Sequence, residues 1–267
     1  MKYLSGSDLA SFIKERQLHQ VRILAGNKIF PKLAIVICGN DLPSQKYIGL
    51  KQEYGNEIGI AVEIYKVEQT DAIKTIGVLN SNKEVQGIIV QLPLPDIKNT
   101  DEILNSVLPS KDLDGLGQNS IYDSATPTAI MWLLAGYNVN LAGKQIVIVG
   151  QGRLIGKPLV AIMQSSGLNP VVVDEFTENI PQTISEADVL VTAVGKANII
   201  KAQDIRQGAV VIDAGVASEN GVLKGDLADD VYERDDLTLT PKTGGVGPLT
   251  VCALFDNVIK AAQPQAK

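Results

Sequence analysis

Short apolar runs rich in valine and isoleucine alternate with longer stretches of helical periodicity along most of the chain. The expected strands lie at 33–38, 61–65, 87–91, 145–149, 170–174, 188–193 and 209–213. Helices are expected between them, one with Ser44 as its N-cap and another beginning near Asp71. Strands that alternate with helices are typical of βαβ units. The pattern therefore predicts an α/β fold with a mainly parallel sheet.

A polar, turn-rich stretch at residues 109–124 separates the two halves of this pattern. A helical pattern at 129–134 follows it, and an apolar helical pattern at 249–262 comes near the end of the chain. We expect two lobes around a cleft, a favoured place for a ligand site. The first domain is expected at 1–120, completed by a C-terminal helix at 249–267, and the second, of Rossmann type, at 121–248.

Composition and charge narrow the class of protein. The chain has 267 residues, 45% hydrophobic and 20% charged, as in globular proteins with a buried core. The net charge of −6 argues against nucleic-acid binding, because proteins of that kind show basic patches. No apolar stretch approaches the roughly 20 residues that span a bilayer. The start of the chain lacks the apolar core of a signal peptide, so we expect a cytoplasmic protein.

Two residue types limit the possible chemistry. Cys38 and Cys252 lie in apolar runs without metal-like spacing, and we expect buried free thiols, which suit a reducing compartment. The single histidine, His19, lies in an amphipathic helical stretch at 9–24 and is expected to be an ordinary surface residue. A histidine-rich metal site is excluded, and we expect no metal.

A glycine-rich loop follows the strand at 145–149. Gly150, Gly152 and Gly156 have the spacing Gly-x-Gly-x-x-x-Gly, one residue longer than the usual dinucleotide fingerprint. Glycines let the backbone approach a pyrophosphate, and a helix N-terminus after the loop favours its charge. Asp174 ends the next strand, where a carboxylate can accept a hydrogen bond from a ribose hydroxyl. These features predict a dinucleotide site. The alternative is a tight turn in an unrelated α/β domain.

The first half carries three polar features that suit a ligand site. Tyr47 and Lys51 stand at i and i+4, so an aromatic ring and an amine share one helical face. Gln91 ends a strand, at the edge of a parallel sheet where ligands gather. Asp112 and Asp114 lie in the polar stretch between the domains. The alternatives are a solvated helix face, a glutamine bound to loop backbone and a turn with two solvated acids.

The loop before the final helical pattern is unusually rich in glycine. Gly244, Gly245 and Gly247 fall within four residues, and Pro248 follows them. This density indicates backbone held against a ligand, although a structural crossover loop needs the same residues.

In order along the chain, these segments resemble the bifunctional methylenetetrahydrofolate dehydrogenase/cyclohydrolase family. The most specific matches are Ser44-x-x-Tyr47-x-x-x-Lys51, Val90-Gln91-Leu92-Pro93-Leu94-Pro95, Lys111-Asp112-Leu113-Asp114-Gly115 and Gly244-Gly245-Val246-Gly247-Pro248-Leu249-Thr250. The resemblance extends from Pro31 to the C-terminal helix. It implies folate on the first domain, NAD or NADP on the second, a homodimer, and a place in one-carbon metabolism and purine biosynthesis.

The resemblance also implies roles for individual residues. Lys51 resembles the catalytic lysine of the family, Tyr47 the aromatic residue against the folate rings, and Gln91 the partner that tunes the lysine. Asp114 resembles the acid that binds the pterin edge. The implied folate-binding residues are Tyr47, Lys51, Gln91, Leu92, Pro93, Asp114, Gly244, Gly245 and Pro248. The implied cofactor-binding residues are Gly150, Gln151, Gly152, Arg153, Leu154, Ile155, Gly156, Asp174, Gly215 and Val216.

The implied chemistry suits these residue types. Oxidation of the methylene carbon mainly requires correct placement of the nicotinamide ring, because the nitrogen lone pairs of folate stabilise the cation that forms. Hydrolysis of the methenyl ring requires proton transfers, which a lysine with a lowered pKa can perform.

The chain departs from the usual family pattern at the cofactor loop. Members usually have arginine and serine where Gln151 and Gly152 stand, and many have histidine and serine in place of Asp174 and Glu175. These changes favour NAD over the usual NADP. Other departures, at 124–127, 241–243 and Glu53, leave the catalytic positions unchanged.

Two other functions stay open at this point. One is a dehydrogenase without cyclohydrolase activity, although the presence of both Lys51 and Gln91 argues against it. The other is a non-catalytic module that binds folate or a dinucleotide, in which the lysine position should be lost.

Overall fold

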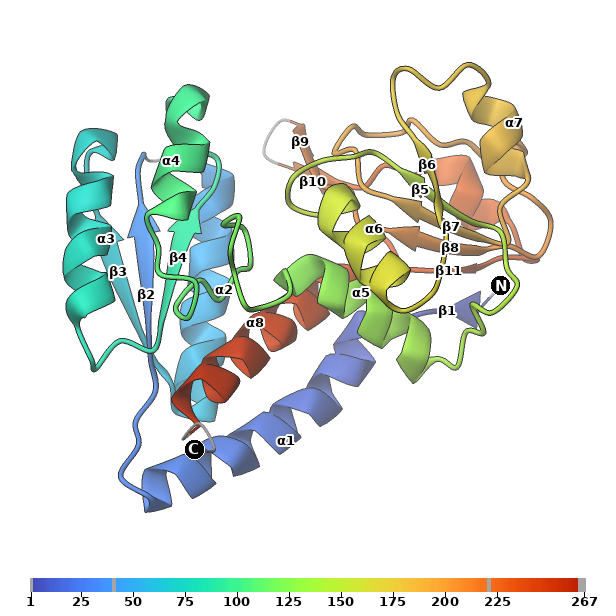
Figure 1. Ribbon diagram of the computed structural model, residues 1–267. Helices are drawn as coiled ribbons and strands as arrows, with labels where there is room; N and C mark the ends of the chain where they lie inside the picture. Colours follow the sequence, from blue (N-terminus) through green and yellow to red (C-terminus); the bar gives the residue numbers. More distant parts are fainter. Residues whose placement is uncertain (1, 40–41, 220–221, 264–267) are drawn as a thin grey trace. The chain divides into compact units, whose positions relative to one another are not determined.

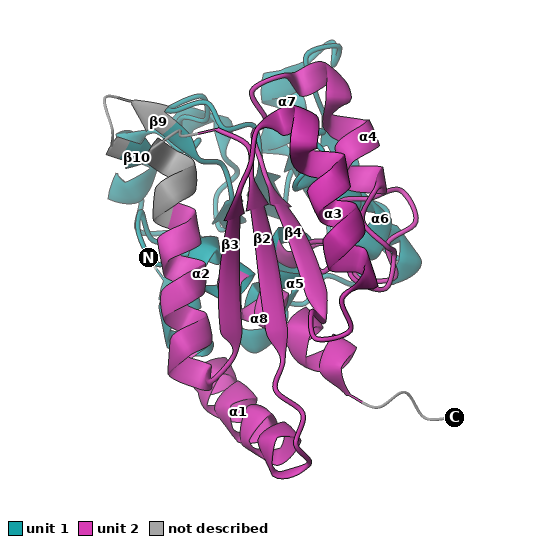
Figure 2. Cartoon of the chain, turned by 90° about the vertical axis from the view of Figure 1, so that its left-hand side faces the viewer, with its two compact units in different colours: residues 1–10, 126–250 teal, residues 11–125, 251–267 magenta. Residues whose placement is uncertain are grey.

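A computed structural model of the chain describes residues 2–39, 42–219 and 222–263, and Figure 1 shows its elements. The chain forms two compact units, coloured separately in Figure 2. Unit 1 comprises residues 1–10 and 126–250, and unit 2 comprises 11–125 and 251–267. The first ten residues thus fall in unit 1, because β1 (Lys2–Tyr3) pairs with β11 (Thr238–Leu239).

Unit 2 is built on a parallel sheet with the strand order β3-β2-β4. Its strands are β2 (Lys32–Ile37), β3 (Ala61–Lys66) and β4 (Gly87–Gln91). The helices that lie wholly or largely in it are α1 (Gly6–Gly26), α2 (Leu42–Ile58), α3 (Ala72–Ser81), α4 (Thr100–Asn105) and α8 (Val246–Ala262). Apolar side chains of β2 and β4 are buried, and each contributes about 1.5–3 kcal/mol to stability.

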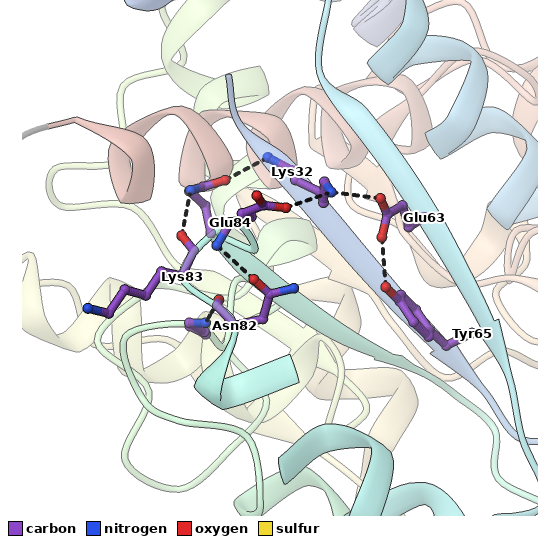
Figure 3. A network of polar contacts seen from close by, with 8 residues as sticks. Lys32, Glu63, Tyr65, Asn82, Lys83 and Glu84 are labelled. Carbon is purple, nitrogen blue, oxygen red and sulfur yellow. Dashed lines mark hydrogen bonds and ion pairs between the residues drawn. The ribbon is translucent and has the colours of Figure 1, made fainter. Parts of the chain in front are cut away.

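Lys32, the first residue of β2, belongs to a polar network that extends along β3, shown in Figure 3. The Lys32 ammonium forms ion pairs with Glu63 at 2.8 Å and Glu84 at 3.6 Å. The Tyr65 hydroxyl donates a hydrogen bond to Glu63 at 2.7 Å. Because Lys32 begins β2 and Gln91 ends β4, the ion pairs of Lys32 stabilise the edge of the sheet opposite to the one that carries Gln91.

Three helices of unit 2 meet at a buried hydrogen-bonded cluster. The Gln17 side chain on α1 donates to the Cys252 carbonyl on α8 at 2.8 Å. The Tyr54 hydroxyl on α2 donates to the Gln17 side-chain oxygen at 2.7 Å. Tyr54 lies one turn beyond Lys51, so this cluster fixes the part of α2 that carries the lysine. Cys38 and Cys252 are buried free thiols, as predicted.

Unit 1 is built on a six-stranded, parallel sheet with the order β1-β11-β8-β7-β5-β6. Its longer strands are β5 (Ile146–Val149), β7 (Val189–Thr192) and β8 (Val210–Asp213), and β6 (Val171–Val173) lies at one edge. Its helices are α5 (Ala125–Gly136), α6 (Gly156–Ser165) and α7 (Ile180–Ser185). An antiparallel hairpin of β9 (Ala217–Glu219) and β10 (Val222–Lys224) follows β8.

The α/β fold with mainly parallel sheets is confirmed, and each predicted strand lies where a strand is found. The prediction that Ser44 caps α2 is wrong, because α2 begins at Leu42. Pro43 is tolerated in the first helical turn, where backbone N–H groups have no partner within the helix. Residues 264–267 of the expected C-terminal helix lie outside the described residues. Among the described residues, no helix is long and apolar enough to cross a membrane.

Candidate active site and cofactor loop

Lys51 and Gln91, predicted from different elements, are hydrogen-bonded to each other in unit 2. The Lys51 Nζ donates to Gln91 Oε1 at 3.1 Å. The Gln91 Nε2 donates to the Leu92 carbonyl at 2.8 Å, which orients the amide with its oxygen toward the lysine. Burial lowers the pKa of the Lys51 ammonium, and the negative charge of Asp114 opposes this effect. Lys51 is therefore suited to exchange a proton.

The charge of Asp114 acts on this lysine because the segment at 111–115 runs beside β4. Ile88 donates its backbone N–H to the Lys111 carbonyl at 2.7 Å, and Ile88 forms a parallel bridge with Asp112. Leu113 is buried against Gly87, where a Cβ atom would lie 1.8 Å from the leucine side chain. Only glycine at position 87 admits this packing.

The other two polar residues of the segment at 111–115 have structural contacts. The Lys111 ammonium donates to the carbonyls of Leu79 and Asn82 at the end of α3, at 3.0 and 2.7 Å. The Asp112 carboxylate accepts a hydrogen bond from the Gly117 backbone at 2.8 Å, and burial raises its pKa. Asp112 is 5% exposed, so a turn with two solvated acids does not describe this segment.

Tyr47 lies on α2 one turn before Lys51, as its spacing predicts. Its side chain is half-buried, and this burial raises the pKa of its hydroxyl. Leu92 and Pro93 follow Gln91 directly, and the peptide bond that joins them is cis. Unit 2 therefore brings Lys51, Gln91 and Asp114 into interaction. It also carries Tyr47, one helical turn before Lys51, and Leu92 and Pro93, which follow Gln91.

The glycines of the loop at 244–247 have structural contacts within unit 1. Gly244 has a φ of +77°, and its carbonyl accepts a hydrogen bond from the Ser7 N–H at 3.0 Å. A Cβ atom at Gly6 would lie 1.8 Å from the Gly245 carbonyl oxygen. Pro248 lies in the first turn of α8. The loop thus packs against the start of α1, and it belongs to a different unit from Lys51.

The glycine-rich loop connects β5 to α6, as predicted. Gly150 has a φ of +100°, and a Cβ atom there would lie 2.8 Å from the Ala193 carbonyl oxygen. A Cβ atom at Gly156, the first residue of α6, would lie 2.0 Å from the Gly150 carbonyl oxygen. Gly152 is exposed, and a Cβ there would have no neighbour closer than 3.9 Å. Two glycines thus form the turn, and the third leaves its backbone open.

Asp174 follows β6 and is bound by residues on both sides. Its Oδ2 accepts a hydrogen bond from the Gln151 side chain at 3.2 Å. Its Oδ1 accepts from the Phe176 N–H at 3.0 Å and the Thr177 hydroxyl at 3.3 Å. The acid and the glycine-rich loop are therefore neighbours, which fits an adenosine ribose at this edge of the sheet.

The remaining predicted cofactor residues lie on the same edge of the sheet. Arg153 and Leu154 are exposed, and Ile155 precedes α6. Gly215 and Val216 follow β8, and Val216 is exposed. An exposed backbone at Gly152, the N-terminus of α6 and a carboxylate after β6 are features that fit a dinucleotide. Among the described residues, no group of three or more His, Cys, Asp or Glu side chains is placed to hold a metal ion.

Two supporting residues were missed by the sequence patterns. Asn257 on α8 is buried, and its side chain donates to the carbonyls of Leu113 and Asp123 at 2.9 and 3.1 Å. The Ser124 hydroxyl donates to the Gly115 carbonyl at 2.8 Å. The sequence signal that could have identified Asn257 is a polar residue within an otherwise apolar helix. Both side chains hold the segment that carries Asp114.

The fold and these groups define an α/β enzyme with a Rossmann-type unit and a second unit that carries a partly buried lysine. Residues 4–114 match the family model for the catalytic domain of tetrahydrofolate dehydrogenase/cyclohydrolase, and residues 124–266 match the model for its NAD(P)-binding domain. The chain belongs to the tetrahydrofolate dehydrogenase/cyclohydrolase family. The predicted family is confirmed, and with it a nicotinamide dinucleotide cofactor and a tetrahydrofolate substrate.

Individual relatives match this chain over nearly their whole length. The bifunctional protein FolD of Acetivibrio thermocellus is 37% identical over 280 residues, covering 100% of this chain and 98% of the relative. The crystal structure of the bifunctional methylenetetrahydrofolate dehydrogenase/cyclohydrolase FolD of Campylobacter jejuni has a TM-score of 0.92 and 31% identity, covering 98% of both chains. The Trypanosoma brucei enzyme, solved with NADP and an inhibitor, has a TM-score of 0.90 and 28% identity, covering 97% of this chain and 96% of its own.

Proposed function

We propose that this enzyme oxidises 5,10-methylenetetrahydrofolate and hydrolyses the methenyl product to 10-formyltetrahydrofolate, and that Lys51 transfers the protons of the second reaction. The observation that carries the proposal is the partly buried Lys51 ammonium at 3.1 Å from Gln91. A neutral amide oxygen accepts a hydrogen bond without adding a charge. The lysine therefore keeps its lowered pKa, which favours the neutral amine that can accept a proton.

The hydrolysis can be written with its atoms balanced. Water adds to the methenyl carbon, and one of its protons is lost to Lys51 in its neutral form. The bond from this carbon to N5 then breaks, N5 receives a proton from Lys51, and the remaining hydroxyl becomes the formyl carbonyl as it loses its own proton. The net reaction consumes one water and releases one proton to solvent. A lysine that switches between its two forms serves both steps.

The oxidation relies on placement. When bound, the nicotinamide dinucleotide would supply the acceptor for the hydride that leaves the methylene carbon. Tyr47, Gln91 and Asp114 are proposed to hold the folate, with Tyr47 against its rings and Asp114 on the pterin edge. The support is their position around Lys51 in unit 2. Leu92, Pro93, Gly244, Gly245 and Pro248 are proposed as further folate contacts.

The dinucleotide is proposed to bind unit 1, at the carboxyl edge of its sheet. Gly150, Gly152 and Gly156 provide the turn and the open backbone for the pyrophosphate. Asp174 is held by Gln151 and Thr177, both neutral side chains, and is suited to bind ribose hydroxyls. We therefore propose a preference for NAD over NADP.

A single absorbance assay tests these reactions. Purified enzyme is incubated with methylenetetrahydrofolate and either NAD or NADP, and the reduced cofactor and the methenyl product are followed at separate wavelengths. We expect reduced cofactor to form and the methenyl form to be consumed by hydrolysis. The contrary outcome is that reduced cofactor forms but the methenyl product disappears no faster than it does without enzyme. The protein would then be a dehydrogenase without cyclohydrolase activity.

A homodimer and a cytoplasmic location are proposed as well, with a supply of one-carbon units for purine biosynthesis. The homodimer and the metabolic role rest on the family resemblance. The cytoplasmic location is supported by the two buried free thiols, which are compatible with a reducing compartment. Light scattering of the purified chain would measure the oligomeric state, and a monomer at micromolar concentration would contradict the dimer.

A further inference from the structure

Among the acids of unit 1 whose burial the structure describes, Asp226 is the most completely buried, and it lies outside every predicted site. Its side chain is 0% exposed. Its carboxylate accepts hydrogen bonds from the backbone N–H groups of Val194 at 2.8 Å, Gly195 at 2.9 Å and Lys196 at 2.9 Å. Three successive N–H groups around one anion form a nest, of the kind that binds phosphate in other proteins. Here the chain fills the nest with its own carboxylate.

A second acid, Asp213, lies at the end of β8 and is joined to Asp226. Its carboxylate accepts hydrogen bonds from the Gly215 and Asp226 N–H groups, each at 3.1 Å. It also accepts from the Leu227 N–H and the Thr192 hydroxyl, each at 3.2 Å. The two acids therefore connect the ends of β7 and β8 to the segment at 225–227.

Two glycines make room for this pair of acids. A Cβ atom at Gly215 would lie 2.1 Å from the Asp226 carboxylate, and one at Gly225 would lie 2.0 Å from an oxygen of Asp213. Each acid thus packs against the backbone beside the other. The arrangement fixes the course of the loop after β8, which includes Val216.

The loop at 193–196, which Asp226 binds, also packs against the glycine-rich loop. A Cβ atom at Gly150 would lie 2.8 Å from the Ala193 carbonyl oxygen and 3.1 Å from the Val194 side chain. Val194, whose N–H binds Asp226, is thus packed against the turn proposed to hold the pyrophosphate. A shift of the loop at 193–196 would therefore also move the backbone at Gly150.

We propose that Asp226 and Asp213 are positioning residues for the nicotinamide dinucleotide, which shape the loops after β5, β7 and β8 without touching it. The inference rests on the proposed cofactor site in unit 1. Asparagine at position 226 would retain one acceptor oxygen and present an NH2 group to an N–H donor. It would leave at least one of the three N–H groups without its bond, and the loop would move away from Gly150.

The test compares Asp226→Asn with Asp188→Asn. Asp188 precedes β7, at the amino edge of the same sheet, and likewise binds a backbone N–H, that of Gln145 at 3.0 Å. For Asp226→Asn we expect the KM for the dinucleotide to rise at least about tenfold, since small misplacements in a site are costly. Hydrolysis of the methenyl form, which uses no cofactor, should stay within about twofold of wild type. Asp188→Asn should leave both quantities near wild type, whatever its effect on the Tm.

Three outcomes would overturn the inference. They are an unchanged dinucleotide KM in Asp226→Asn, an equal loss of oxidation and hydrolysis, or the same rise in KM for Asp188→Asn. If Asp226→Asn does not fold, Asp213→Asn takes its place, with a rise of at least about threefold expected because Oδ1 remains an acceptor. A wild-type enzyme that reduces no dinucleotide would instead contradict the proposed cofactor site.

Discussion

The amide of Gln91 is fixed between Lys51 and its own chain neighbour. Its oxygen accepts from the Lys51 Nζ at 3.1 Å while its nitrogen donates to the Leu92 carbonyl at 2.8 Å. Turning the amide over would place its NH2 group against the lysine and lose both hydrogen bonds. Gln91 therefore holds the Lys51 amine in one place and adds no charge to it.

Replacing Lys51 with methionine keeps most of the apolar stem and removes the amine. We expect hydrolysis of the methenyl form to fall at least about a hundredfold, the scale of a general acid–base contribution. Stopped-flow absorbance of the methenyl form measures this rate, and thermal unfolding checks the fold. A folded Lys51→Met enzyme with near-normal hydrolysis would remove the lysine from the mechanism.

Replacing Gln91 with glutamate places a negative charge beside Lys51 and raises the pKa of its ammonium. The neutral amine is the form that accepts a proton, and its fraction rises with pH through that pKa. In the wild type, burial lowers the pKa of Lys51 from its ordinary value of 10.5. Hydrolysis should therefore begin to rise at a lower pH than it would with a solvent-exposed lysine. We expect the pH–rate profile of hydrolysis in Gln91→Glu to shift to higher pH, with a lower rate at pH 7. A Gln91→Glu profile that coincides with that of wild type would argue against tuning by Gln91.

Replacing Asp114 with alanine removes the acceptor proposed for the pterin edge. Loss of a charge-assisted hydrogen-bonded pair should weaken folate binding by about 1.5–3 kcal/mol. The dissociation constant of a tetrahydrofolate analogue, measured by fluorescence or calorimetry, checks this. Asp114→Asn, which keeps one acceptor, should lose less. Weaker dinucleotide binding with normal folate binding would reverse the assignment of the two units.

Replacing Asn257 with leucine tests the support of the segment that carries Asp114. The carbonyls of Leu113 and Asp123 would lose their shared donor in a buried place. We expect the free energy of unfolding to fall by about 1–3 kcal/mol and the KM for folate to rise, with the dinucleotide KM unchanged. Urea unfolding and steady-state kinetics measure these effects. An unchanged folate KM would mean that Asp114 needs no support from α8.

The parts of the fold that could be predicted from the sequence are those with local signals. The apolar runs of β2, β4, β5 and β7 are continuous because both faces of a parallel sheet are covered. Strands β1 and β11 have two residues each, too few for any periodicity, and they form because β11 pairs with β8 and β1 pairs with β11. Such elements depend on tertiary contacts that no short window of sequence reports.

The same distinction applies to the site. Tyr47 and Lys51 follow from helical spacing, and Gly150 and Gly156 follow from the turn they form. The partners that hold these groups come from distant positions. Asn257 binds a segment more than a hundred residues earlier, and Asp226 binds the loop after β7 across 30 or more residues. In one sequence each looks like an ordinary polar residue, because its role depends on a partner brought near only by the fold.

The cofactor preference can be tested at Asp174. Gln151, Phe176 and Thr177 donate hydrogen bonds to its carboxylate, which places the charge at the end of β6. A ribose 2′-hydroxyl can donate to this acid, whereas a 2′-phosphate would be repelled. We expect kcat/KM for NAD to exceed that for NADP at least about tenfold in the wild type, a difference that Asp174→Ser should reduce or reverse.

Glu175 offers a matched control for this prediction. It is the next residue and it is exposed, so Glu175→Ser removes the same charge without removing the acceptor at position 174. If the preference arises from the general negative charge of this loop, both variants should gain activity with NADP equally. If it arises from the carboxylate beside Gln151, only Asp174→Ser should. A wild-type preference for NADP that Asp174→Ser leaves unchanged would contradict the proposal and make Arg153 the residue to replace next, because its guanidinium could then be binding the phosphate.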